Sequence, residues 1–218
     1  MAEPEMTERT EILPMFPLGS VLFPDGVLPL HIFEIRYQQM LNHALETDRR
    51  FGVVLITRGS EVGGGDERST CGTVATIDDY QRFDDGRAAV VATGTDRFEV
   101  VEWLEDDPYP QARVRLLDSE LVRAADRVAL DAARQRFDEL IELGHRLGRI
   151  ASVPESEWLS DTEQAVWQLA GRTPCTALDQ YQILAAPSRV ERLEHISGVL
   201  GDIYQDLELM GPIDPPQS

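Results

Sequence analysis

Up to about Ser119, the hydrophobic residues come in short runs separated by turn residues, a pattern typical of β-strands. In the last run, Ala112, Val114 and Leu116 alternate with polar side chains, which is the period of a strand with one buried face. The predicted strands, rich in Val, Ile, Phe and Thr, are residues 51–57, 73–77, 88–93, 97–103 and 111–117. Strands this short predict a compact, strongly bent sheet or an open barrel.

Prolines interrupt the apolar segment 14–37, at Pro14, Pro17, Pro24 and Pro29. No continuous helix runs through them, because each proline fixes φ and lacks a backbone N–H. We therefore expect very short strands here, joined by a tight turn at residues 24–26. Beyond the last proline, Tyr37, Met40, Leu41 and Leu45 recur at helical spacing, which predicts one helix over residues 34–46.

From Glu120 onward the hydrophobic period changes to 3.6 residues. It predicts a helix that runs to about Leu147 and ends at Gly148. The apolar stripe of this helix consists of Leu121, Ala125, Val128, Ala132, Phe137, Leu140 and Ile141.

Three shorter helical patterns follow. Ser160 or Asp161 caps the first, residues 179–185 form the second, and Ser188 with Glu191 makes a capping box for the third. The pattern predicts a small helical bundle. The expected organisation is a flexible tail at 1–11, a β-barrel domain at 12–118, a helical bundle at 119–210 and a proline-rich tail at 211–218.

An ordered set of motifs runs through the first half of the chain. Its segments are Pro14–Tyr37, Phe51–Ile56, Glu61–Asp66, Cys71–Ile77, Gln81–Arg87, Gly94–Val100 and Asp107–Pro110. The set resembles the N-terminal, substrate-binding domain of the Lon protease family. Two positions depart from the family pattern: Ile35, where proline is usual, and Cys71, where valine is commoner.

The resemblance implies an α+β fold, in which a PUA-like β pseudo-barrel with one helix is followed by a C-terminal α-helical bundle. It also implies a protein that binds polypeptides in protein quality control or proteolysis. We expect a stand-alone bacterial member of the family, without the ATPase and protease domains.

The basic residues are all arginine, 20 of them, so lysine is absent. A Walker-type phosphate loop, a Ser-Lys proteolytic dyad and Schiff-base chemistry each need a lysine. The sequence therefore predicts no enzyme, no catalytic residue and no cofactor.

A formal net charge of −19 opposes the binding of nucleic acid and of anionic membranes, since both attract clustered cations. No stretch approaches the roughly 18 apolar residues that a membrane helix needs. Residues 1–11 hold four glutamates and do not resemble a secretory signal. Cys71 and Cys175, far apart and without metal-ligand spacing, fit a cytoplasmic protein with reduced thiols.

Several constellations have a chemical and a structural interpretation, and the structural one is favoured each time. Ser20, Asp25 and His31 are the residue types of a hydrolytic triad, but no nucleophile-elbow motif accompanies them. His31 fits a core or boundary histidine better than a catalytic base. Glycines 63–65 fit a hairpin loop, and Glu142 with His145 a solvated helix face. The acidic pairs at 78–79 and 84–85 fit hairpin turns. We expect no metal site.

The candidate residues for peptide or protein binding are loop aromatics, since aromatic side chains supply much of the energy at protein interfaces. They are Phe23, Phe33, Tyr80, Phe83 and Tyr109, of which half or more are expected to belong to the core. The favoured hypothesis is a polypeptide-binding protein. The alternatives are a small hydrolase on the same barrel and an RNA-binding PUA-like module.

Overall fold

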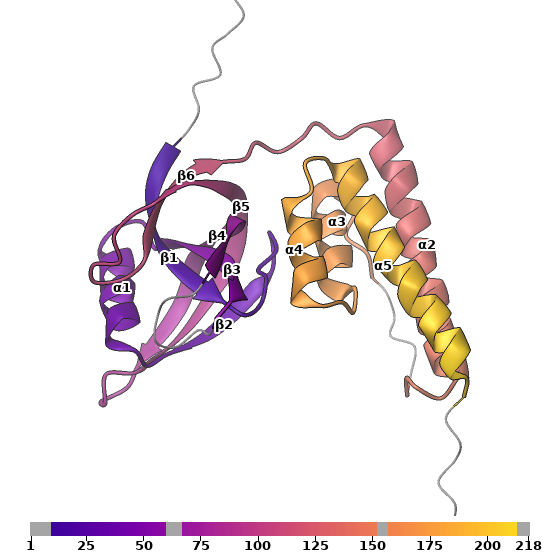
Figure 1. Ribbon diagram of the computed structural model, residues 1–218, viewed down its shortest axis with the longest axis horizontal. Coiled ribbons are helices and arrows are strands. Elements are labelled where there is room, and N and C mark those ends of the chain that lie inside the picture. The colour runs from indigo at the N-terminus through magenta and orange to yellow at the C-terminus, as the bar shows by residue number, and fades with distance from the viewer. Residues whose placement is uncertain (1–9, 60–66, 152–156, 213–218) are drawn as a thin grey trace, which may run out of the picture. The chain divides into compact units, whose positions relative to one another are not determined.

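The structure, a computed structural model, describes residues 10–59, 67–151 and 157–212 (Figure 1). The chain divides into two compact units, with the boundary between Ser119 and Glu120. The predicted loop at glycines 63–65 and most of both predicted tails lie outside the described residues.

The first unit is a six-stranded mixed sheet with one helix. Its elements are β1 (Thr10–Leu18), β2 (Val27–Ile32), α1 (Ile35–Glu46), β3 (Arg50–Arg58), β4 (Glu67–Arg82), β5 (Ala88–Trp103) and β6 (Gln111–Leu116). The strands lie in the order β2-β5-β4-β3-β1-β6, and an additional β5–β6 pairing nearly closes the sheet on itself. The predicted α+β fold, a pseudo-barrel with one helix followed by helices, is confirmed.

The strands predicted at 88–93 and 97–103 are one continuous strand, β5. Its first half pairs with β2 and its second half with β6, while β4 runs along both halves. Gly94 lies between the halves, where a Cβ would sit 2.3 Å from the carbonyl oxygen of Phe23. The absence of a side chain at Gly94 therefore lets the turn after β1 lie against β5, where the Asp25 N–H donates to the Gly94 carbonyl (2.9 Å).

Apolar side chains form two buried clusters in this unit. The larger joins α1 to β1, β2 and the central strands, through residues that include Phe16, Leu30, Tyr37, Met40 and Phe51. The smaller consists of Leu13, Met15, Val54, Val74, Phe98, Ala112 and Val114. Strands β1, β3 and β4 contribute to both clusters, so both of their faces are covered.

The second unit consists of α2 (Ala124–Arg146), α3 (Thr162–Arg172), α4 (Ala177–Ala185) and α5 (Arg189–Met210). The predicted caps are largely as observed: the Asp161 carboxylate accepts from the Gln164 N–H, and Gly148 after α2 has φ +71°. At α5, Ser188 accepts from the Glu191 N–H, while its hydroxyl donates to the Glu191 carboxylate. The Glu191 carboxylate thus accepts from the Ser188 hydroxyl, whereas in a capping box it accepts from the N–H of the N-cap residue.

The prediction of which α2 side chains are buried is wrong for the first half of the helix. The helix begins at Ala124, and Leu121 and Val128 are 88% and 71% exposed. Its buried residues are Asp126, Leu130, Ala133, Phe137, Leu140, Leu143 and Gly144. Asp126 turns inward, where it meets a buried cationic partner, while Val128 of the same helix faces solvent and Leu121 lies before the helix begins.

That partner is Arg189, which is 1% exposed. Its Nη1 donates to the Asp126 carboxylate (2.7 Å) and its Nε donates to the Glu163 carboxylate (2.8 Å). It also donates to the backbone carbonyl of Glu120 (2.9 Å), so one guanidinium joins α2, α3, α5 and the chain that enters α2. Burial by itself raises the pKa of Asp126, but hydrogen bonds from the Arg123 N–H and Arg189 outweigh it and lower the pKa.

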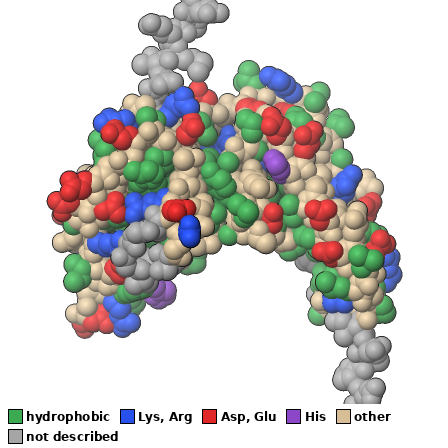
Figure 2. Space-filling view, in the orientation of Figure 1, with side chains coloured by type: hydrophobic (Ala, Val, Ile, Leu, Met, Phe, Trp, Pro, Cys, Tyr) green, Lys and Arg blue, Asp and Glu red, His purple; other side chains and the backbone are tan. Residues whose placement is uncertain are grey.

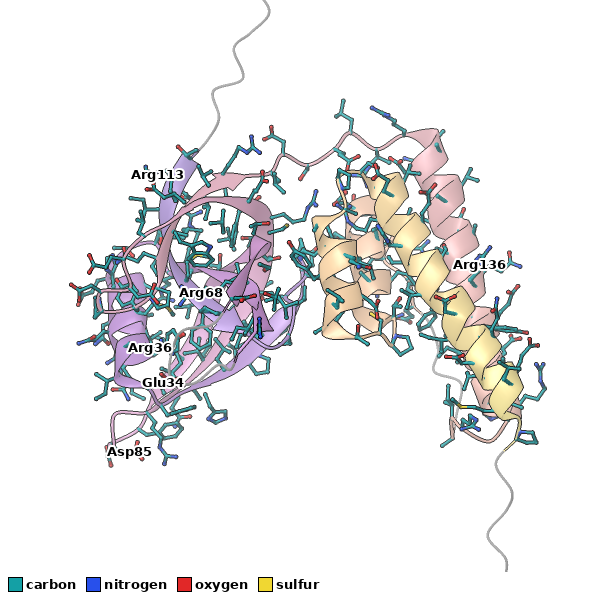
Figure 3. The ribbon with its side chains drawn as sticks, in the orientation of Figure 1. Glu34, Arg36, Arg68, Asp85, Arg113 and Arg136 are labelled. Carbon is teal, nitrogen blue, oxygen red and sulfur yellow. The ribbon has the colours of Figure 1, made fainter. Side chains whose placement is uncertain are left out.

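Replacing Arg189 with methionine is expected to lower the free energy of unfolding of the helical unit by about 3–5 kcal/mol. The reason is that Asp126 is left buried without its cation. Urea unfolding followed by helical circular dichroism measures the change. Arg136→Met, at an exposed position of α2 (Figure 3), is the matched control and should change the value by less than about 0.5 kcal/mol. Equal stability of both variants would contradict a central role for Arg189.

Candidate functional site

Two strand edges in the barrel unit lack a partner strand among the described residues. β1 pairs with β6 only through Thr10–Pro14, while Met15–Leu18 pair with β3 on the other side. The last bond on the β6-side edge of β1 is that of the Met15 N–H to the Pro110 carbonyl, so this edge is open beyond Met15. β2 pairs with β5 alone, so its second edge is open as well.

A groove of about 270 Å³ lies between these two strands, and we call it the β1–β2 groove. Its floor consists of buried apolar side chains: Phe16, Leu18, Leu30, Ile32 and Tyr37. Its rim is more polar and more exposed, and includes Ser20, Pro29, His31, Phe33 and Glu34. An apolar floor with a polar rim is the usual chemistry of a binding site.

Contacts between side chains fix the end of the groove nearest α1. The rings of Phe16 and Tyr37 lie 4.3 Å apart between centroids, and the Arg36 guanidinium lies 4.6 Å above the Tyr37 ring. Arg36 Nε also donates to the Glu34 carboxylate at 2.9 Å (Figure 3). Because Glu34 is engaged by Arg36, the groove ends in a neutralised ion pair.

Three exposed aromatic side chains, which we call the aromatic end, come from β4 and from the ends of β2 and β4: Tyr80, Phe33 and Phe83, of which Phe33 lines the groove. Ile32 of β2 pairs with Ala88 of β5, which pairs in turn with Arg82 of β4. The residues that follow, Phe33 and Phe83, therefore leave the sheet at the same end.

Helix α1 holds the aromatic end in place. The Gln38 side-chain amide donates to the Phe33 carbonyl (3.0 Å), and the same amide lies beside Gly86 of the β4–β5 turn. Arg82 of β4 donates to Asn42 of α1 (2.6 Å). Phe33 is 57% exposed, Phe83 40% and Tyr80 39%, so all three rings present apolar surface to solvent, and Phe33 does so on the groove rim.

The other two predicted aromatics are buried, at 6% exposure for Phe23 and 4% for Tyr109. The Tyr109 hydroxyl is hydrogen-bonded to Nδ1 of His43 on α1 (2.6 Å), and burial raises the pKa of Tyr109. Two of the five aromatics therefore belong to the core, which is fewer than the half or more that was expected, and the other three lie at the surface.

The residues considered for catalysis or metal binding are dispersed. Ser20 and His31 line the same groove, with His31 exposed rather than in the core, while Asp25 lies in the exposed turn with φ +61°. Glu142 and His145 are exposed on α2. Among the described residues, no three His, Cys, Asp or Glu side chains come together as a metal site. Both cysteines are free thiols.

A second hollow, of about 490 Å³, lies between α2 and α5. Its lining is mainly polar, with Gln135, Arg136, Glu139 and Gln205 around Gly201 and Tyr204. Leu200 is the one buried apolar side chain among its described lining residues, compared with five in the floor of the β1–β2 groove. None of the helices that the structure describes is long and apolar enough to cross a membrane.

Phe33 is a binding candidate from the sequence alone and lies on the groove rim, whereas the position of the groove was not predicted. The floor residues belong to the larger apolar cluster of the barrel unit, so by residue type they do not differ from ordinary core. The available signal was the pair Pro17 and Pro29, because proline inside a sheet is confined to positions that need no ladder N–H. Two such prolines in neighbouring short strands mark two open edges.

The fold and the groove can now be compared with known proteins. The family described as the ATP-dependent protease La (LON) substrate-binding domain matches residues 12–202. The Lon protease of Syntrophus aciditrophicus (strain SB) is 28% identical over 211 residues, which cover 91% of this chain and 26% of that protein. The chain therefore spans about a quarter of the length of this curated relative.

Two solved structures share the fold. The Lon N-terminal domain protein from Xanthomonas campestris superimposes with a TM-score of 0.62 at 23% identity, over 86% of this chain and 98% of that one. The N-terminal domain of Lon protease from the Mycobacterium avium complex gives a TM-score of 0.65 at 15% identity, over 88% and 99%.

Alanine substitution of two phenylalanines tests where the aromatic residues lie. Phe23→Ala should lower the free energy of unfolding by about 3–5 kcal/mol, since it leaves a cavity in the core. Phe33→Ala removes the same ring from a side chain that is 57% exposed, and should change the value by less than about 0.5 kcal/mol. Chemical denaturation of both variants measures the difference. A larger loss at Phe33 than at Phe23 would overturn the assignment.

Proposed function

This chain belongs to the family of the LON substrate-binding domain, and we propose that it binds polypeptides in the context of proteolysis. The ligands would be unfolded clients or a partner protein with an exposed apolar segment. The surface proposed for binding is the β1–β2 groove together with the aromatic end.

The observation that carries the proposal is the continuity of these two features. Phe33 belongs to both, because it lines the groove and stands at the aromatic end. Exposed aromatic rings beside an apolar floor give a binding surface whose energy comes from apolar burial and needs little sequence specificity. Such a surface suits ligands that share exposed hydrophobic side chains and no common fold.

The charge of the chain fits this role. A net charge of −19 favours solubility of a protein with exposed apolar surface. On the face shown in Figure 2, arginine side chains lie scattered among acidic ones, without the clustering that phosphate backbones attract. We therefore propose a cytoplasmic protein whose partners are polypeptides, with no role for nucleic acid or membranes.

The proposal includes no catalytic step. The part of the Lon protease that this chain matches is the substrate-binding domain, and the sequence has no lysine for a Ser-Lys dyad or a Walker motif. Ser20 and His31 then serve as polar rim groups of the groove.

Replacing Phe33 or Phe83 with serine should weaken the binding of a permanently unfolded, carboxymethylated protein. Each substitution removes an exposed ring from the proposed surface, so we expect a loss of about fivefold or more in affinity, corresponding to about 1 kcal/mol. Fluorescence anisotropy with the labelled unfolded protein measures the dissociation constant. The native form of the same protein should show negligible binding.

Val101→Ser is the matched control, since Val101 lies on β5 with the same exposed fraction as Phe33, 57%, and does not line the groove. It should leave the affinity within about twofold of the unsubstituted chain. Equal, negligible binding of the native and unfolded proteins would refute the proposed function.

A further inference from the structure

Proline occupies both open edges that flank the β1–β2 groove: Pro17 in β1 and Pro29 in β2. The direction of the Pro17 backbone follows from its neighbours. The Met15 N–H donates to the Pro110 carbonyl (2.8 Å), so the backbone groups of Met15 point to the β6 side of β1. Successive residues of a strand point their backbone groups to opposite edges, so Pro17 also points to this side, beyond the end of the β6 pairing.

The edge to which the Pro29 backbone points also follows from its neighbours. The Gly94 N–H donates to the Gly26 carbonyl (2.8 Å), and the β2–β5 register continues without a shift from Val27 to Ile32. Even-numbered residues of β2 therefore point their backbone groups to β5, and odd-numbered residues point theirs to the open edge. Pro29 lies at the centre of that edge.

Each proline presents a carbonyl to the open edge but no N–H. A polypeptide strand inserted between β1 and β2 would place a backbone carbonyl opposite each of them, without a donor. A buried carbonyl that loses its hydrogen bond weakens an association by roughly tenfold or more. The two prolines thus act against strand insertion, as prolines on sheet edges do in general.

We propose that the β1–β2 groove receives one large apolar side chain of an extended polypeptide, while the backbone of that polypeptide stays outside the two strand edges. The proposal rests on the proposed function and specifies the chemistry of its ligand. The apolar floor of Phe16, Leu30 and Tyr37 supplies the contact surface.

The size of the groove agrees with a single side chain. Its volume of about 270 Å³ exceeds the roughly 150 Å³ of a cavity that holds benzene, and lies below the usual range for whole ligands. The apolar floor disfavours carboxylate and amide side chains, because a polar group that is buried there loses water without gaining a hydrogen-bond partner. Phenylalanine, leucine and tryptophan side chains fit these requirements.

Short fluorescent peptides separate side-chain insertion from strand insertion. The parent peptide carries one central Phe between Ser and Thr residues. One derivative is N-methylated at both residues that flank the Phe, and another has Ala in place of the Phe. We expect N-methylation to change the dissociation constant by less than about twofold, and Phe→Ala to raise it by about tenfold or more.

Two substitutions in the chain test whether the peptide binds in the groove. Ser20→Trp puts an indole on the groove rim and should weaken binding of the parent peptide by about tenfold, because the indole competes for the groove. Val101→Trp, which adds the same side chain at an exposed position outside the groove, should leave binding within about twofold. Circular dichroism of both variants verifies that they are folded.

The outcomes distinguish the two proposals. Parent-peptide binding that N-methylation abolishes, while Phe→Ala is tolerated, would overturn side-chain insertion and leave polypeptide binding in place. Equal effects of Ser20→Trp and Val101→Trp would also overturn it, because the peptide would then bind elsewhere. If neither the parent peptide nor the unfolded protein bound, both proposals would be overturned.

Discussion

The pairing of β1 is the constraint on which the candidate site depends. The first half of β1 pairs with β6 along one edge, and the second half pairs with β3 along the other edge. Each edge of β1 is therefore paired over only part of its length. The chain then turns at Pro24–Gly26 and continues as β2, which pairs with β5. A gap between β1 and β2 follows from this topology. α1 and the floor side chains close the gap from one side and make it a groove.

The sequence predicted the secondary-structure elements better than it predicted which of their faces are buried and where the groove lies. Pro24, Asp25 and Gly26 specified their turn through local conformational preference, and the helix at 34–46 followed from the spacing of Tyr37, Met40 and Leu41. Asp126 was beyond such reasoning, because a buried carboxylate depends on Arg189, which is distant in sequence. The groove was missed for the same reason: it is a relation between β1 and β2, and no local pattern encodes which edges a sheet leaves open.

Both units have buried apolar cores, and the helical unit adds buried ion pairs to its core. In the barrel unit, apolar side chains on both faces of the central strands supply the core, and glycine at position 94 allows the close approach of the turn after β1. In the helical unit, the Arg189 guanidinium joins three helices through buried ion pairs. The candidate binding surface lies wholly in the barrel unit.

Amide hydrogen exchange of the chain, with and without excess unfolded polypeptide, tests most directly whether the open edges of the barrel form the binding surface. The account predicts slower exchange on binding over residues 16–20 and 27–34, which flank the groove, and around Phe83 of the aromatic end. It predicts no change over α2 and α5. Protection confined to those helices, or no protection in the presence of bound polypeptide, would contradict it.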